Sequence, residues 1–375
     1  MRTSRLFLPI VGAVYAAAAA CYAAVWAIDP YDLRPWGAAA RLADHSYPEA
    51  IVPRLVALAA NDGTDLVLFG GSTARGYTPG MLREAFPDSA RPVNLSFSAP
   101  RSDEFATVLD VLSRSRTVKR VILSLDYTLI KDTPWSSRLL DQRFYTLPWH
   151  DPVPEFDLPA VDLSLRVLAT GILDRAEWMP PQPDRIDVHQ HASLPERPAL
   201  QRKVEQAVEA SRSWVASAPA VPCDAMPELR SVVLPFVKRM AERGVTVDLL
   251  APPLSLALYA DWSVNYPETK FFPGRGAIFA RFMAIRRCAI EMVAGLPNVR
   301  VHVFDADLSI TGDLRRYYDA SHLKDYEAYR EILARIAARE RVATPATWPQ
   351  IEAAIRRAVT EFAPWPGPVR DGVQR

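Results

Sequence analysis

Apolar residues follow two alternating patterns along this chain. Short continuous apolar runs, typical of buried strands, alternate with segments in which apolar residues return every three to four positions, as on one face of a helix. The apolar runs occur at residues 65–70, 92–97, 118–126, 245–250 and 299–304. The helical segments occur at about 78–86, 103–114, 229–243, 275–294 and 324–339. Strands that alternate with helices predict an α/β fold with five parallel strands.

The first residues of the chain form a different kind of segment. Residues 6–28 contain no charged side chain, and a helix of about 20 apolar residues can cross a bilayer. Arg2 and Arg5 precede the segment, so the positive-inside rule places the rest of the chain outside the cytoplasm. We therefore predict a single-pass anchor in a bacterial inner membrane, with the globular part in the periplasm. A cleaved signal peptide and a lipoprotein site at Cys21 are the alternatives.

The pattern divides the whole chain into three parts. Residues 1–36 hold the cytoplasmic stub, the anchor and a juxtamembrane segment, and residues 37–340 form the α/β domain. The strand–helix alternation stops over residues 131–228, a proline-rich stretch with one amphipathic helix near 200–215. We interpret this stretch as an insertion that is a candidate lid. Residues 341–375 form a C-terminal helical tail.

Composition excludes several classes of protein. The chain of 375 residues has 44 Lys and Arg against 43 Asp and Glu, a net charge of +1, so it lacks the basic excess of a nucleic-acid binder. Its three cysteines are too few for a disulfide scaffold, although Cys223 and Cys288 can pair in an oxidising compartment. His189 and His191 lack a third ligand nearby in the sequence. We therefore expect no metal and no cofactor.

Candidate chemistry follows the first and last predicted strands. Ser72 lies in a Gly-Gly-Ser turn directly after the first strand, where an exposed hydroxyl can act as a nucleophile or can cap the next helix. Asp319 precedes His322 by three residues, so the carboxylate can hold one imidazole nitrogen while the other acts as a base. In parallel sheets, ligands bind beyond the carboxyl ends of the strands. We expect these three side chains to meet there.

Together these motifs resemble the SGNH/GDSL hydrolase family. The resemblance implies a flavodoxin-like three-layer sandwich with Ser72 as nucleophile, His322 as base and Asp319 as its orienting partner. The second family block is similar to 94–96, where Ser96 replaces a glycine whose amide stabilises the oxyanion. The third block is similar to 124–127, where Asp126 replaces an asparagine of the oxyanion hole.

A membrane-anchored branch of this family is more similar still. The shared motifs are Asp29-Pro30-Tyr31, Gly71-Ser72-Thr73-Ala74-Arg75-Gly76, Asn94-Leu95-Ser96 and Leu125-Asp126-Tyr127. They resemble alginate O-acetylation proteins and the D-alanyl transfer protein of teichoic acid synthesis. The resemblance implies a serine esterase or O-acyltransferase that modifies an envelope or exported polysaccharide. A multi-spanning membrane acyltransferase is then a candidate acyl donor.

Four further residues are predicted to bind the oxyanion or the substrate: Asn94, Ser96, Asp126 and Arg75. A buried Asp126 would pair with Arg75, or it would be neutral and donate a hydrogen bond. The altered oxyanion blocks also fit a different class of protein. In that alternative, the chain is an inactive binding or assembly component of a polysaccharide synthesis or export complex.

Overall fold

A six-stranded sheet forms the centre of the computed structural model, which describes residues 4–28, 64–97, 100, 102–125, 165, 198–259 and 277–363. The strand order is β2-β1-β3-β4-β5-β6. Strands β1 to β5 are parallel, and β6 runs antiparallel to β5. The strands are β1 (Leu66–Phe69), β2 (Pro92–Asn94), β3 (Arg120–Ser124), β4 (Thr246–Ala251), β5 (Val299–Val303) and β6 (Val342–Ala343).

The predicted α/β class is confirmed, and each of the five predicted strands overlaps an observed one. The sheet nevertheless has a sixth strand that the sequence pattern did not predict. Strand β6 is only two residues long, which is too short to show an alternation of apolar and polar positions. The sheet is therefore mixed rather than wholly parallel.

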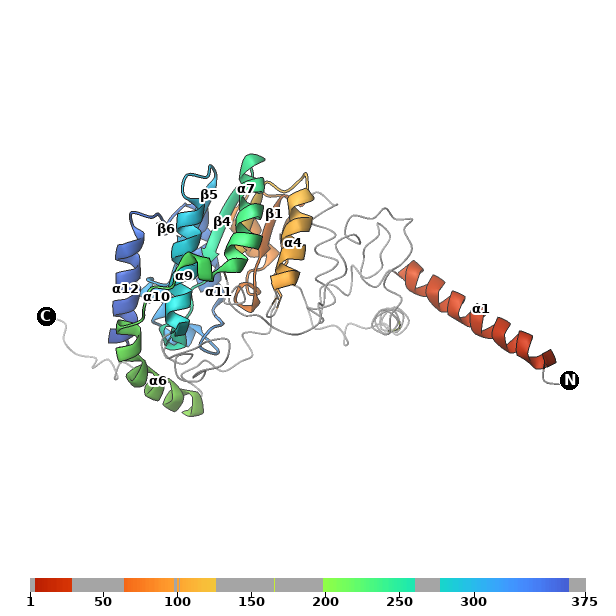
Figure 1. The fold of residues 1–375 in the computed structure, drawn as a ribbon, viewed down its shortest axis with the longest axis horizontal. Coiled ribbons are helices and arrows are strands. Elements are labelled where there is room, and N and C mark those ends of the chain that lie inside the picture. Colours follow the sequence, from red (N-terminus) through yellow and green to blue (C-terminus); the bar gives the residue numbers. More distant parts are fainter. Residues whose placement is uncertain are drawn as a thin grey trace.

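Helices cover both faces of the sheet, as Figure 1 shows. The helices of the α/β body are α3 (Pro79–Ala85), α4 (Ser102–Arg114), α6 (Pro198–Ala216), α7 (Leu234–Glu242), α9 (Ala277–Val293), α10 (Leu308–Thr311), α11 (Tyr326–Ala337) and α12 (Trp348–Glu361). Shorter helical turns are η2 (Ser72–Ala74), η7 (Cys223–Ala225), the π-helix η8 (Leu229–Val233) and η9 (Leu314–Arg316).

Side chains of the strands alternate between two buried clusters. On β1, Val67 and Phe69 pack in a cluster that includes α4, α7 and α9. Leu66 and Leu68 pack on the other face, with α3 and α11. Successive residues of a strand point to opposite faces, so an unbroken apolar run is what a strand needs when helices cover both sides.

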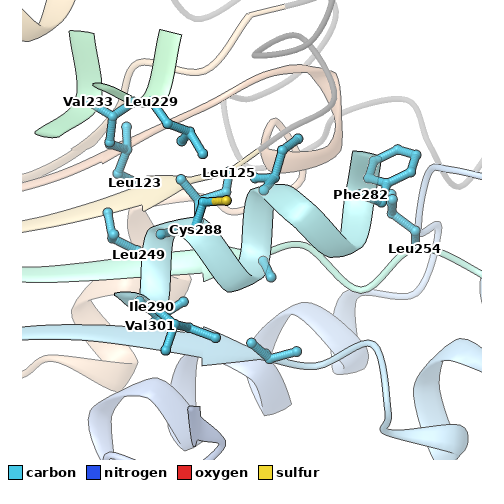
Figure 2. Packing of buried hydrophobic residues seen from close by; sticks show 14 of the residues in the cluster. Leu123, Leu125, Leu229, Val233, Leu249, Leu254, Phe282, Cys288, Ile290 and Val301 are labelled. Atoms are coloured by element: carbon cyan, nitrogen blue, oxygen red, sulfur yellow. The ribbon is translucent and has the colours of Figure 1, made fainter. Parts of the chain in front are cut away.

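A disulfide joins η7 to α9 at the border of the cluster that contains Val67 and Phe69. Cys223 of η7 and Cys288 of α9 are bonded to each other. Figure 2 shows Cys288 among buried apolar side chains contributed by α9, the strands and η8, including Leu123, Leu249 and Ile290. Disulfides form and persist in oxidising compartments, so the pairing is relevant to the compartment in which the protein is found.

The described end of the proline-rich insertion belongs to the globular body. Helix α6 confirms the amphipathic helix predicted near 200–215, and its residues Val204, Val208 and Val215 are buried. It packs against α12 of the C-terminal tail. Most of residues 131–197 lie outside the described residues, and the domain boundaries and the lid remain predictions.

The N-terminal segment is one continuous helix, α1 (Ser4–Ile28), with Cys21 exposed within it. Continuity of the helix over residues 6–28 was predicted and is confirmed. Within the described part of the chain, no helix combines the length and the apolar character that are needed to cross a membrane.

Candidate catalytic triad

Ser72 lies at the carboxyl edge of the sheet, where β1 passes into η2. Gly71 is the N-cap of η2 and Ser72 is its first residue. The alternative role of Ser72 as a helix cap is wrong, because its side chain bonds elsewhere. Gly70 precedes this turn, and a Cβ at that position would lie 2.4 Å from Ser124 Cβ. Only glycine lets the start of the turn approach β3 this closely.

Three side chains meet at this edge in a continuous hydrogen-bonded row. Ser72 Oγ lies 2.8 Å from His322 Nε2. On the other side of the ring, His322 Nδ1 lies 2.7 Å from Asp319 Oδ2. The predicted proximity of Ser72, His322 and Asp319 is confirmed, although 250 positions separate Ser72 from His322. The arrangement can pass a proton from the serine hydroxyl to the imidazole, with the carboxylate fixing the ring.

Asp319 is held by several donors within its own loop. Its Oδ1 accepts from the backbone N–H groups of Ser321 and His322, each at 2.8 Å, and from Ser321 Oγ at 3.0 Å. Burial raises the pKa of Asp319, but the hydrogen bond and charge of His322 and the two backbone donors outweigh it and lower the pKa below its usual value. The carboxylate therefore stays ionised under acidic conditions in which an ordinary aspartate begins to protonate.

This lowered pKa predicts how stability depends on pH. An ionised Asp319 stabilises the folded state at pH values above the ordinary aspartate pKa, about 3.9. That contribution is lost as the pH falls through the lowered folded-state pKa. In the Asp319→Asn variant, the melting temperature should therefore fall less steeply than in the wild type between pH 5 and pH 2. Asp88→Asn, at an exposed site, controls for the loss of one charge. Parallel melting curves for wild type and Asp319→Asn would contradict this account.

The loop that carries Asp319 and His322 rests on the segment that follows β4. Ser255 Oγ donates to Ala320 O at 2.5 Å, and Tyr317 Oη donates to Pro253 O at 2.9 Å. Ser255 and Tyr317 are fully buried. Burial raises the pKa of Tyr317, so its hydroxyl stays protonated and can donate. These two bonds fix the position of the loop that carries Asp319 and His322 relative to the carboxyl ends of the strands.

Aromatic rings fix the orientation of the imidazole and link the two halves of the triad. The Tyr318 ring stacks on His322, with centroids 5.2 Å apart and planes 12° apart. Tyr329 of α11 donates from Oη to Leu323 O at 3.1 Å, next to His322. The Tyr329 ring also contacts Tyr77 edge to face, with centroids 4.7 Å apart. Tyr329 therefore touches both the serine turn and the histidine loop.

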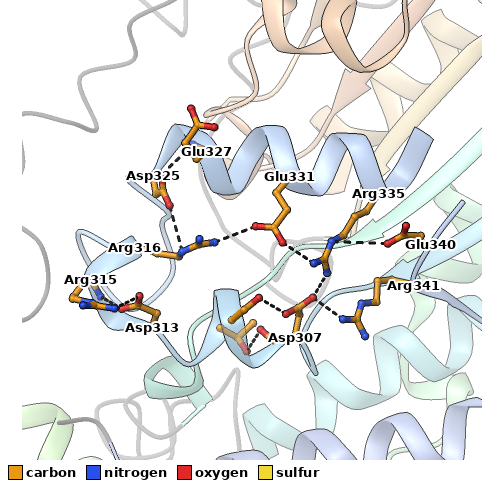
Figure 3. A network of polar contacts seen from close by, with 12 residues as sticks. Asp307, Asp313, Arg315, Arg316, Asp325, Glu327, Glu331, Arg335, Glu340 and Arg341 are labelled. Carbon is orange, nitrogen blue, oxygen red and sulfur yellow. Dashed lines mark hydrogen bonds and ion pairs between the residues drawn. The ribbon is translucent and has the colours of Figure 1, made fainter. Parts of the chain in front are cut away.

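Charged side chains brace the outer end of the same loop (Figure 3). Arg316 Nε lies 3.3 Å from Asp325 Oδ2, and its Nη1 lies 3.4 Å from Glu331 Oε2. These two partners lie beyond the loop, at the start and middle of α11. Exposed ion pairs contribute little stability individually. Here they join the residue before the loop to the helix after it.

The predicted oxyanion residues Asn94, which ends β2, and Ser96, which follows it, have partly different roles. Asn94 Nδ2 donates to Ala74 O at 2.9 Å and to Tyr77 O at 2.6 Å, so this side chain braces the serine turn. Its Oδ1 accepts from the backbone N–H of Ser96 at 2.9 Å. The expectation that the Ser96 amide stabilises an oxyanion is therefore not supported, because this donor is already engaged within the chain.

Other predicted residues fall partly outside the described part of the chain. Arg75 is partly exposed and is the C-cap of η2, and its backbone N–H donates to Ser72 O at 3.3 Å. Asp126 is not among the described residues, so its pairing with Arg75 stays a prediction. His189 and His191 also lie outside them. In the ranges that the structure describes, no group of three or more His, Cys, Asp and Glu side chains could hold a metal ion.

Sequence reasoning missed Ser255, Tyr318 and Tyr329. Tyr318 carried a weak signal, because it directly precedes Asp319. Ser255 follows the fourth predicted strand, where a polar residue after two prolines marks a loop at the carboxyl edge. Tyr329 carried no signal that separates it from the other apolar positions of its helix.

Neither family models nor curated proteins give a match when they are compared with this chain. The geometry of the site therefore has to carry the functional argument.

Proposed function

We propose that the protein is a serine esterase or O-acyltransferase that works through an acyl-enzyme. The hydrogen-bonded row Ser72–His322–Asp319, with distances of 2.8 and 2.7 Å, carries this proposal. Ser72 Oγ forms a bond to the acyl carbon while its proton passes to His322 Nε2. The leaving alcohol then takes that proton as its bond to the acyl carbon breaks. Water or a sugar hydroxyl next attacks the acyl-enzyme and releases Ser72.

The proposal includes membership of the SGNH/GDSL family and a flavodoxin-like core. The order β2-β1-β3-β4-β5 of the five parallel strands supports it, since flavodoxin-like folds have this order. The antiparallel β6 is then an addition at one edge. The acyl acceptor or donor that we propose, from the motifs shared with the alginate and teichoic acid proteins, is an envelope or exported polysaccharide.

A fluorophosphonate probe tests the serine chemistry directly, before any substrate is known. Ser72 Oγ would displace fluoride from the phosphorus atom, and His322 would take the serine proton. We expect a single probe molecule per chain, located on the peptide that contains Ser72 by mass spectrometry. No labelling of the folded protein at neutral pH would favour the alternative, a binding or assembly component that keeps the fold without turnover.

We also propose that the domain lies outside the cytoplasm, in the periplasm, and is held at the inner membrane by the N-terminal segment. The Cys223–Cys288 disulfide supports this placement, because cytosolic thiols are normally kept reduced. The arginines that precede residues 6–28 support the same direction.

Reporter fusions test this placement. We expect alkaline phosphatase fused after residue 40 to be active and β-galactosidase fused at the same point to be inactive. The first enzyme needs an oxidising compartment and the second needs the cytoplasm. The opposite pattern would remove both the periplasmic placement and the envelope polymer as substrate. A fusion that removes residues 1–28 should lose phosphatase activity and is the control.

A further inference from the structure

Two serine hydroxyls are buried at the carboxyl edge of the sheet without a hydrogen-bond partner in the part of the chain that the structure describes. They are Ser96 Oγ and Ser124 Oγ. A buried hydroxyl without a partner lowers stability compared with an apolar group of the same shape. Contacts among the described residues therefore give no reason for serine at these positions. A partner that arrives from outside the chain would give one.

The register of the strands places Gly70 between these two serines. Leu68 pairs with Asn94 on β2, so two residues further on Gly70 is level with Ser96. The bond from Phe97 N–H to Gly70 O, at 3.4 Å, continues that register. On the other side, Phe69 pairs with Leu123, which puts Ser124 level with Gly70. Both serines therefore flank the residue that begins the Gly70–Gly71–Ser72 turn.

The side chain of Ser96 lies on the same face of the sheet as the serine turn. Asn94 and Ser96 are two residues apart, and side chains at this spacing along an extended chain point to the same face. Asn94 Nδ2 bonds to carbonyls of the serine turn, Ala74 O and Tyr77 O. Ser96 is one step further toward the open edge than Asn94. Its hydroxyl is therefore directed to the side on which Ser72 meets His322.

Ser124 differs from Ser96 in how it is covered. Ser124 is fully buried, whereas Ser96 as a residue is partly exposed. A Cβ at Gly70 would lie 3.2 Å from Ser124 Oγ and 3.1 Å from Ala74 Cβ. The Ser124 hydroxyl thus lies beneath the turn, next to Ala74, where a substrate does not reach. Both hydroxyl oxygens are buried, but only Ser96 belongs to a residue that is partly exposed at this edge of the sheet.

The serine turn supplies one further donor. Ser72 is the first residue of η2, and the first N–H groups of a helix have no partner within the helix. Among the described residues, no acceptor bonds to the Ser72 N–H. An acyl-transfer site needs two or more such donors at the oxygen that becomes negative in the transition state. The Ser96 amide does not qualify, because Asn94 Oδ1 accepts its hydrogen.

We infer that the Ser96 hydroxyl, together with the Ser72 N–H, donates a hydrogen bond to the oxyanion of the tetrahedral intermediate. This inference rests on the proposed acyl-transfer function. Ser96 would then be a catalytic residue that acts through its side chain, where the family resemblance implied a backbone amide. The loss of one such donor lowers kcat by about 10²–10³-fold in a comparable site.

Two matched variants test the inference: Ser96→Ala and Ser124→Ala. Each removes one buried, unpartnered hydroxyl at the same level of the sheet. The measurements are kcat and KM for p-nitrophenyl acetate, the rate of fluorophosphonate labelling and the melting temperature. We expect Ser96→Ala to lower kcat and the labelling rate by about 10²-fold or more while KM changes little. Its melting temperature should stay equal or rise. Ser124→Ala should keep kcat and the labelling rate of the wild type.

The possible outcomes separate the inference from the proposed function. Labelling and turnover of Ser96→Ala at wild-type rates would overturn the inference and leave the proposed function standing. A lower melting temperature with unchanged kcat would also overturn it, since the hydroxyl would then be structural. Equal losses in both variants would do the same by indicating a general effect on packing. A wild-type protein that neither turns over the ester nor reacts with the probe would end the proposed function and this inference together.

Discussion

Replacing Ser72 with alanine is expected to abolish turnover of a small acyl ester, with a fall in kcat of about 10⁴-fold or more. The substitution removes the oxygen that lies 2.8 Å from His322 Nε2, and no other hydroxyl contacts that nitrogen in the described residues. The folded state should persist, because one hydrogen bond of this kind contributes only about 0.5–1.5 kcal/mol. The measurements are ester hydrolysis and thermal melting of the same preparation.

A second serine serves as the control for this experiment. Ser231→Ala, on η8, removes an exposed hydroxyl that donates to Pro227 O away from the triad, and it should keep full activity. If Ser72→Ala retained the activity of the wild type, Ser72 would not be the nucleophile. Another group in the chain would then carry the turnover, and the proposed acyl-enzyme on Ser72 would be wrong. A large drop in melting temperature would require refolding controls before the activities are compared.

Much of the fold could be predicted from the pattern of apolar residues in the sequence. Leu66 and Phe69 are both fully buried although they face opposite layers, so the run between them shows no polar alternation. That absence predicts a strand covered on two sides. Strand ends were less predictable. Strand β2 ends at Asn94 rather than at residue 97, although bonds from Leu95 N–H to Leu68 O and from Phe97 N–H to Gly70 O continue along β1.

The triad itself could be predicted because topology brings its parts together. Ser72 follows β1, and the loop with Asp319 and His322 follows β5. Because these strands are parallel, both segments lie at the carboxyl edge of the sheet. The side chains that hold the triad in place could not be predicted in this way. Ser255 donates a hydrogen bond to Ala320 O although 65 positions separate the two residues. Tyr329 donates to Leu323 O from the hydroxyl at the end of a buried ring. Their roles depend on distances between side chains, which a pattern of residue types does not contain.

Gly76→Ala is expected to be the most damaging of the small substitutions near the site. A Cβ at Gly76 would lie 2.0 Å from Tyr329 Cζ and 2.3 Å from Tyr329 Oη. Tyr329 is buried, so its ring cannot swing into solvent to make room. Such overpacking costs about 1–3 kcal/mol and sometimes more. The displaced hydroxyl would also release Leu323 O, the carbonyl that follows His322. We expect a lower melting temperature and a fall in kcat of about 10²-fold, as a 1 Å misplacement of a catalytic group can produce.

A double-mutant cycle connects this loss to Tyr329 rather than to the glycine alone. Tyr329→Leu removes both the Cζ and the hydroxyl that the new methyl group would strike. Gly76→Ala should therefore cost much less stability in the Tyr329→Leu background than in the wild type, with a coupling free energy of about 1 kcal/mol or more. Gly12→Ala is the control, because a Cβ there meets nothing within 4 Å. Gly12 lies in helix α1, where alanine is the better helix former, so this variant should not lower the melting temperature. Additive losses at Gly76 and Tyr329 would mean that the two residues are independent. The serine turn and the histidine loop would then be held together by the Ser72–His322 bond and not by the aromatic contact between them.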